Sequence, residues 1–165
     1  MANSFTVNCY SPKDVSLNIG GYPVAGWQSI TIARSVKGWT VVRGIRGKNT
    51  RVRNNDTSAT LVITLMGSSP TNDVFSQIHE LDLEFGTARI ALTLKDASGS
   101  SVFSTNEAYI TSYPSVAFTG QIEDRTWELF AQSTESYIVG GNSRPVTSLF
   151  DNALSEASDF VNNLF

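Results

Sequence analysis

The sequence is poor in the residues that build catalytic and metal sites. Its 165 residues include one cysteine, Cys9, and one histidine, His79. A lone cysteine excludes an intramolecular disulfide, and one cysteine with one histidine cannot build a zinc site without several carboxylates. As a general base, His79 would need a nucleophile and an orienting partner, which the sequence does not offer. We therefore expect no metal, no cofactor, no catalytic residues and no enzyme, with His79 a solvated or interface side chain of a helix.

Signals for a membrane span, a secretory leader or a phosphate loop are also missing. No stretch approaches the roughly 18 apolar residues of a spanning helix. Met1–Ser4 shows neither a basic nor an apolar leader segment. Gly44–Gly47 lacks the strand–loop–helix context and the Lys-Ser/Thr ending of a phosphate-binding loop. Glu123 and Asp124, as neighbours in a predicted strand, point to opposite faces and form a poor acid pair. These absences favour a cytoplasmic product.

Charge is scarce and unevenly spread. Charged residues make up 16% of the chain, against about 25% in typical globular proteins. From Asn54 onward there are four basic residues against fourteen acids. The segment Arg34–Arg53 has no acid and seven basic residues, which are Arg34, Lys37, Arg43, Arg46, Lys48, Arg51 and Arg53.

Two interpretations of this cluster stay open. It is either a solvated hairpin on an acidic domain, or a basic end that steers one copy onto the acidic body of the next. A nucleic-acid site is disfavoured, because no aromatic side chain follows Trp39 among the cations and the isoelectric point is about 5.1.

Apolar and polar residues alternate with period two along most of the chain, which predicts half-buried strands. Gly20-Gly21-Tyr22-Pro23 and Gly47-Lys48-Asn49 read as turns between them. Several short strands separated by turns predict a mainly β barrel or sandwich. The expected strands include Phe5–Cys9, Val15–Ile19, Ile30–Ile32, Val41–Arg46, Thr50–Arg53, Leu61–Leu65, Ile90–Leu94, Glu107–Tyr113, Ile122–Gln132 and Tyr137–Val139.

Two segments have a helical period instead. Val74, Phe75, Ile78 and Leu81 share one helix face just after Pro70. The second segment, about 147–164, can begin at a Thr147 or Ser148 cap. Such an apolar terminal helix must lie on its own barrel or on a neighbouring copy. Its candidate interface residues are Phe150, Leu154, Ala157, Val161 and Leu164.

We find no internal repeat and no linker, so we expect one domain over residues 1–165. The polar stretch around Arg46–Ser58 is too long and too charged for a tight turn throughout. It predicts a projecting hairpin at about 43–58.

The order and spacing of four stretches resemble the tail tube proteins of contractile-tailed bacteriophages, which share their plan with type VI secretion tubes. Val15–Arg34 is similar to the family's opening strands and glycine-aromatic turn, and Trp39–Asp56 to its long hairpin. Ala59–Asp73 resembles a strand leading into a short helix. Tyr113–Phe118 followed by Arg125–Leu129 resembles the later strands. Lys48-Asn49 stands at the hairpin tip where the family pattern would allow a glycine.

The resemblance implies a tail-tube-type β-barrel or sandwich with one packed short α-helix, here followed by a C-terminal helix. It implies a structural subunit forming hexameric rings that stack around a lumen, through which double-stranded DNA passes during ejection without specific binding. The expected partners are the protein itself, the tail sheath, the baseplate or tube initiator, the tape measure and the tail terminator. The expected location is the virion tail, assembled in the host cytoplasm. The inter-ring hairpin would use Arg43, Arg46, Lys48, Asn49, Arg51, Arg53 and Asn54.

Two alternatives remain beside the tube subunit. One is a related tail component that forms a single ring, such as a tube initiator or terminator. The other is a monomeric β-sandwich that grips a sugar through Trp27, Trp39 or Tyr22, which requires exposed aromatic side chains.

Overall fold

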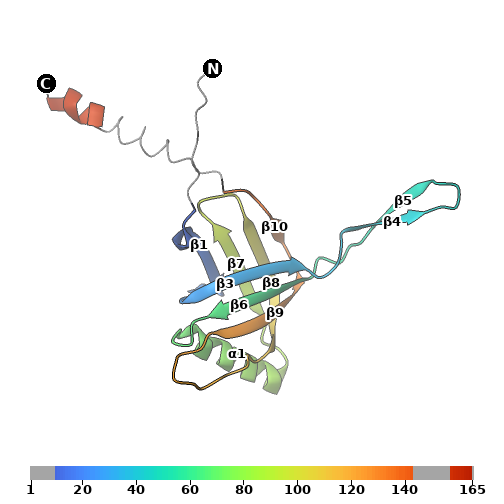
Figure 1. Ribbon diagram of the computed structural model, residues 1–165, viewed down its shortest axis with the longest axis horizontal. Coiled ribbons are helices and arrows are strands. Elements are labelled where there is room, and N and C mark those ends of the chain that lie inside the picture. The colour runs from blue at the N-terminus through green and yellow to red at the C-terminus, as the bar shows by residue number, and fades with distance from the viewer. Residues whose placement is uncertain (1–9, 143–156, 165) are drawn as a thin grey trace.

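The computed structural model describes residues 10–142 and 157–164. It holds an eight-stranded antiparallel sheet, a separate two-stranded sheet and the helix α1 (Thr71–Phe85) (Figure 1). The 3-10 turn η1 (Pro12–Asp14) lies before the first strand. The strands are β1 (Val15–Ile19), β2 (Tyr22–Pro23), β3 (Trp27–Arg34), β4 (Trp39–Arg43), β5 (Asn49–Arg53), β6 (Ala59–Leu65), β7 (Ile90–Asp96), β8 (Val102–Ser112), β9 (Arg125–Ser133) and β10 (Ser136–Ile138).

The large sheet is strongly bent. Its strand order is β2-β1-β7-β8-β9-β6-β3, and β10 pairs with β8 beside this path. The pairing of β8 with β9 shifts register between Glu107 and Ala108 and again between Ile110 and Ser112. Such irregularities bend a strand and increase its twist. The β3-β6-β9 half therefore crosses over the β1-β7-β8 half (Figure 1), and one apolar core fills the space between them.

The predicted alternation explains which side chains enter this core. Every second residue of β6 is fully buried, and β6 pairs with β9 so that Leu61 lies opposite Leu129 and Ile63 opposite Trp127. Cross-strand pairs of this kind are the main unit of sheet stabilisation. The mainly β barrel or sandwich fold predicted from the sequence is confirmed.

Helix α1 packs on the sheet through a face rotated from the one we expected. Phe75 and Ile78 lie against the core as predicted, but Leu81 does not. His79 is 6% exposed and its ring meets Tyr113 edge-on at 4.5 Å between centroids, whereas Leu81 is 52% exposed. The buried face runs through Thr71, Phe75 and His79, at the i, i+4, i+8 spacing of one stripe. The prediction of a solvated or interface His79 is therefore wrong. The helix ends at Gly86, whose φ of 66° is a left-handed conformation that favours glycine.

Other boundaries also differ from expectation. The strand expected from Ile122 begins at Arg125, and β8 begins at Val102 rather than near Glu107. The Gly20-Gly21 turn is present, with both glycines at positive φ. The expected strand Phe5–Cys9 lies outside the described residues. Of the predicted C-terminal helix, 157–164 is helical, while Phe150 and Leu154 lie outside the described residues. No described helix combines the length and apolarity of a membrane span.

Candidate assembly interface

Strands β4 and β5 form a hairpin that stands away from the large sheet (Figure 1). Among the described residues they pair with each other and with no further strand, in a register that runs from Trp39 opposite Arg53 to Arg43 opposite Asn49. All the residues of both strands are exposed. The separate strands thus occupy 39–53, whereas the sequence predicted a hairpin at about 43–58.

Hydrogen bonds fix both ends of this hairpin. At its tip the Gly44 N–H donates to the Lys48 carbonyl at 2.8 Å, and Gly47 adopts a φ of 81°. At its base the Asn54 N–H donates to the Gly38 carbonyl at 2.8 Å. The tip geometry relies on glycine at position 47, so the expected departure at Lys48-Asn49 leaves the turn intact.

The two segments that join the hairpin to β3 and β6, residues 35–38 and 54–58, form a stem that is tied to the large sheet. Arg34 donates a guanidinium hydrogen bond to the Thr57 carbonyl at 2.8 Å, and the Thr134 hydroxyl donates to the same carbonyl at 3.0 Å. The Ser58 N–H donates to the Asp56 carboxylate at 2.9 Å, which holds the pKa of Asp56 below its usual value. The stem is therefore anchored where the chain leaves β3 and enters β6.

The register divides the hairpin into two chemically distinct faces, because successive strand residues point to opposite sides. One face, which we call the cationic face, contains Trp39, Val41, Arg43, Asn49, Arg51 and Arg53. The other, the neutral face, contains Thr40, Val42, Thr50 and Val52. On the cationic face, the Arg51 guanidinium lies over the Trp39 ring at 4.1 Å. Both side chains are exposed in the single chain, where a cation over an aromatic ring contributes about 0.5–1 kcal/mol.

The structure brings most of the predicted hairpin residues together. Arg43, Asn49, Arg51 and Arg53 share the cationic face, while Arg46 and Lys48 lie in the turn between the strands. Asn54 lies at the base, where its side-chain oxygen accepts from the Asp56 N–H. Sequence reasoning did not include the exposed Trp39, Val42 and Val52 in the candidate interface. The period-two pattern of both strands carried that signal.

An acidic surface lies on another part of the molecule. Helix α1 carries Asp73, Glu80, Asp82 and Glu84 and no lysine or arginine. Exposed apolar side chains accompany them at Leu81, Leu83 and Phe85. Helix α1 is thus opposite in charge to the hairpin and, like it, presents apolar groups to solvent.

The described residues give little support to the other candidate sites. Within 10–142 and 157–164, no group of three His, Cys, Asp or Glu side chains could hold a metal ion. Buried His79 has no hydrogen-bond partner for Nδ1 among the described residues. Of the aromatic residues considered for sugar binding, Trp39 and Tyr22 are exposed and Trp27 is half-buried. The three belong to three different strands, of which β4 is in the separate hairpin sheet.

The chain was compared with protein families and with known proteins by sequence. No family model matches the chain. It is 29% identical over 146 residues to Structural protein ORF10 of Pseudomonas phage KPP10, covering 82% of this chain and 84% of that protein.

Three solved structures contain a chain with a similar fold. The anti-feeding prophage tube-terminating cap matches with a TM-score of 0.54 and 11% identity, over 87% of this chain and 100% of that one. A chain in the tail of the empty gene transfer agent particle matches with a TM-score of 0.57 and 13% identity, over 79% of this chain and 100% of that one. A chain in the sheath–tube complex of an extracellular contractile injection system, PVC, matches with a TM-score of 0.52 and 13% identity, over 81% of this chain and 91% of that one. The chain therefore has the tail-tube fold that its sequence resembles, and it is a relative of a phage structural protein.

Proposed function

We propose that this chain is a structural, non-catalytic subunit of a phage tail tube, which forms rings that stack with the β4–β5 hairpin reaching the next ring. The observation that carries the proposal is the isolated, fully exposed hairpin. A two-stranded hairpin alone is marginally stable in water, and apolar side chains gathered on an exposed surface mark an interaction site. A partner would cover Trp39 and Val41 on the cationic face, and Val42 and Val52 would be covered only by contacts on the opposite, neutral face.

Charge supports a second copy of the chain as that partner. The hairpin and its turn carry five cations and no acid, while α1 carries four acids and no cation. A contact between two different surfaces of identical subunits propagates head to tail and generates open polymers. Opposite charges on the two surfaces would steer the subunits into this head-to-tail orientation.

The comparisons support the tail as the setting. One similar chain comes from a tail with C6 symmetry, which favours six subunits to a ring. Another comes from a sheath–tube complex, which favours a sheath as an outer partner. Tape measure, initiator and terminator proteins follow as partners from the same proposal. A lumen wall without a basic lining would let DNA pass without sticking, because phosphate contacts dominate non-specific binding.

A single-ring terminator is the second candidate. The similar chain from the tube-terminating cap covers 87% of this chain, more than either the gene transfer agent tail or the sheath–tube chain. A terminator would use one of its ring faces and leave the other without a partner of its own kind. The length of the assembly therefore separates the two roles.

Negative-stain electron microscopy of the purified full chain at high concentration tests the proposal. A tube subunit is expected to give hollow tubes of variable length, and a terminator single rings. Monomers at every concentration would contradict a self-assembling subunit and would favour the monomeric sugar-binding β-sandwich.

A further inference from the structure

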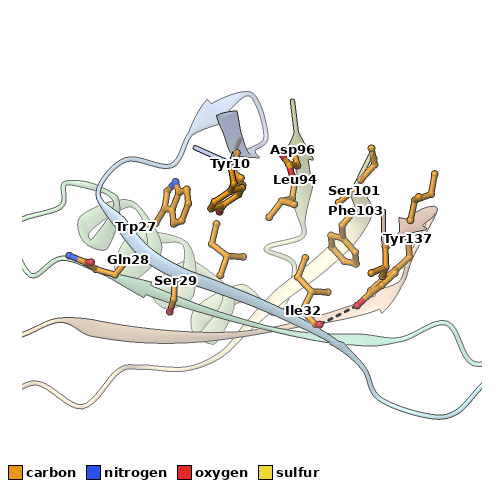
Figure 2. Close-up of a pocket in the computed structure, with 15 residues that line it drawn as sticks. Tyr10, Trp27, Gln28, Ser29, Ile32, Leu94, Asp96, Ser101, Phe103 and Tyr137 are labelled. Atoms are coloured by element: carbon orange, nitrogen blue, oxygen red, sulfur yellow. Dashed lines mark hydrogen bonds between the residues drawn. The ribbon is translucent and has the colours of Figure 1, made fainter. Parts of the chain in front are cut away.

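The bent sheet leaves a groove open along one side of its core. The groove has a volume of about 440 Å³ and lies between β3 and a wall made by β1, β7, β8 and β10. Figure 2 shows Trp27 and Ile32 of β3 on one side, with Leu94, Phe103 and Tyr137 across from them. The Tyr137 hydroxyl donates to the Ile32 carbonyl at 3.1 Å, which joins the two sides at one end.

This groove is a continuation of the hydrophobic core. Five of the partly buried apolar residues that pack against the core also line it, namely Trp27, Ile30, Ile32, Leu94 and Tyr137. Its one carboxylate, Asp96, already accepts hydrogen bonds from the Ser98 N–H and hydroxyl. The groove therefore suits apolar side chains better than a polar ligand, because filling it would remove core residues from water.

The C-terminal helix supplies apolar side chains of this kind. Ala157, Phe160, Val161 and Leu164 are spaced at i, i+3, i+4 and i+7 within the described helix 157–164, which places them on one face. In its own chain this face is open to solvent, with Phe160 67%, Val161 52% and Leu164 63% exposed. Among the described residues, no side chain fills this apolar groove and none covers this apolar face of the helix.

Chain length allows the helix to reach a neighbouring subunit. Residues 143–156, which precede the helix, can span at most about 48 Å when fully extended. A domain of this size has a radius of gyration of about 15 Å. The connection is therefore long enough to carry the helix beyond its own subunit.

We propose that the groove binds the C-terminal helix of a second copy of this chain, with Phe160, Val161 and Leu164 entering between β3 and the opposite wall. The inference rests on the proposed function, because a ring or tube is what holds a second copy alongside. It assigns the terminal helix to contacts between subunits, and it leaves the hairpin as a separate contact.

Disulfide trapping between two single-cysteine proteins tests this assignment. In a Cys9→Ser background, one full-length protein carries Val15→Cys, at a half-buried groove position in β1. The other carries Leu164→Cys and a tag that gives the mixed dimer its own mass. A disulfide needs Cα atoms roughly 4.4–6.8 Å apart. After mixing and mild oxidation, we expect the mixed dimer at about ten times the control yield.

Two matched controls use neighbouring positions on the opposite faces. Ser16→Cys replaces Val15→Cys on the outer side of β1, and Asn163→Cys replaces Leu164→Cys on the polar side of the helix. Each control lies one residue from the variant it replaces, so it samples nearly the same region of space. A mixed dimer that forms equally with the controls would overturn the assignment.

Microscopy of the Cys9→Ser parent separates this inference from the tube proposal. Rings or tubes without excess cross-link would overturn the helix assignment and leave the tube proposal standing. Excess cross-link without rings or tubes would support the helix assignment and contradict the tube. A chain carrying both Val15→Cys and Leu164→Cys that closes only on itself would place the helix in its own groove, which also overturns the assignment.

Discussion

A buried tryptophan and an asparagine tie helix α1 to the sheet. The Trp127 indole N–H donates to the Asn72 side-chain oxygen at 2.9 Å, and the Phe75 ring meets Trp127 edge-on at 5.4 Å between centroids. The Asn72 amide group donates to the carbonyls of Met66 and Ser69. Asn72 itself is 4% exposed. Its side chain therefore satisfies two buried polar groups, the Trp127 N–H and the Ser69 carbonyl, and the part-buried Met66 carbonyl.

Replacing this asparagine should destabilise the subunit. Asn72→Ala leaves the Trp127 N–H buried without a partner, and we expect a loss of about 2 kcal/mol in the free energy of unfolding. This corresponds to a melting temperature lower by about 4–8 °C. Denaturant titration of the monomer measures it. As a control, Asn106→Ala on the exposed surface should change stability by less than about 0.5 kcal/mol. Equal effects of the two substitutions would contradict the role of Asn72.

His79 shows what a single sequence cannot decide at the residue scale. The helix itself was predictable, because Phe75 and Ile78 recur with the helical period. Which of two adjacent stripes faces the sheet depends on Tyr113, which follows β8 and contacts the His79 ring. That contact joins residues far apart in the sequence, so local periodicity placed Leu81 inside and His79 outside, the reverse of the structure.

At the scale of elements, the inward-facing residues were predicted well where burial alternates along a strand, although the first residue of β9 was placed three positions too early. β6 and β9 have buried residues at every second position, and their pattern reads directly from the sequence. The division of the hairpin into a cationic and a neutral face was not foreseen, because it needs the pairing of Trp39 with Arg53. Register between strands is a property of two segments together, and the cation cluster alone did not specify it.

Reversing the hairpin charge should block stacking without unfolding the subunit. We expect the variant with Arg46, Lys48, Arg51 and Arg53 changed to Glu to form no tubes at low salt, because like charges would then face α1 of the next copy. Its melting temperature should stay close to that of the parent, since all four positions are exposed. Pelleting by ultracentrifugation, checked by microscopy, measures the loss.

A control with the same change in net charge makes this test specific. Lys13, Arg89, Lys95 and Arg125 are the basic residues of the described ranges that lie outside the 34–53 cluster. Changing these four to Glu should leave tubes intact. If the hairpin variant pellets like the parent at low salt, the electrostatic part of the stacking proposal is wrong.

For the whole molecule, the two proposed contacts differ in physical character. The hairpin presents exposed cations toward an acidic partner, and exposed charges are screened by salt, with a Debye length of about 10 Å at 0.1 M and about 3 Å at 1 M. The groove and the terminal helix bury apolar groups, a contact that salt does not screen. An assembly held by both should therefore come apart in two stages.

We expect 1 M sodium chloride to break tubes into small oligomers that keep the helix-in-groove contact, and not into monomers. Analytical ultracentrifugation across a salt series from 50 mM to 1 M would follow the two species. The Arg46, Lys48, Arg51 and Arg53 to Glu variant should sediment as the small oligomer at every salt concentration, because its hairpin contact is already lost. A parent protein that passes directly from tubes to monomers would mean that one contact, sensitive to salt, holds the whole assembly together.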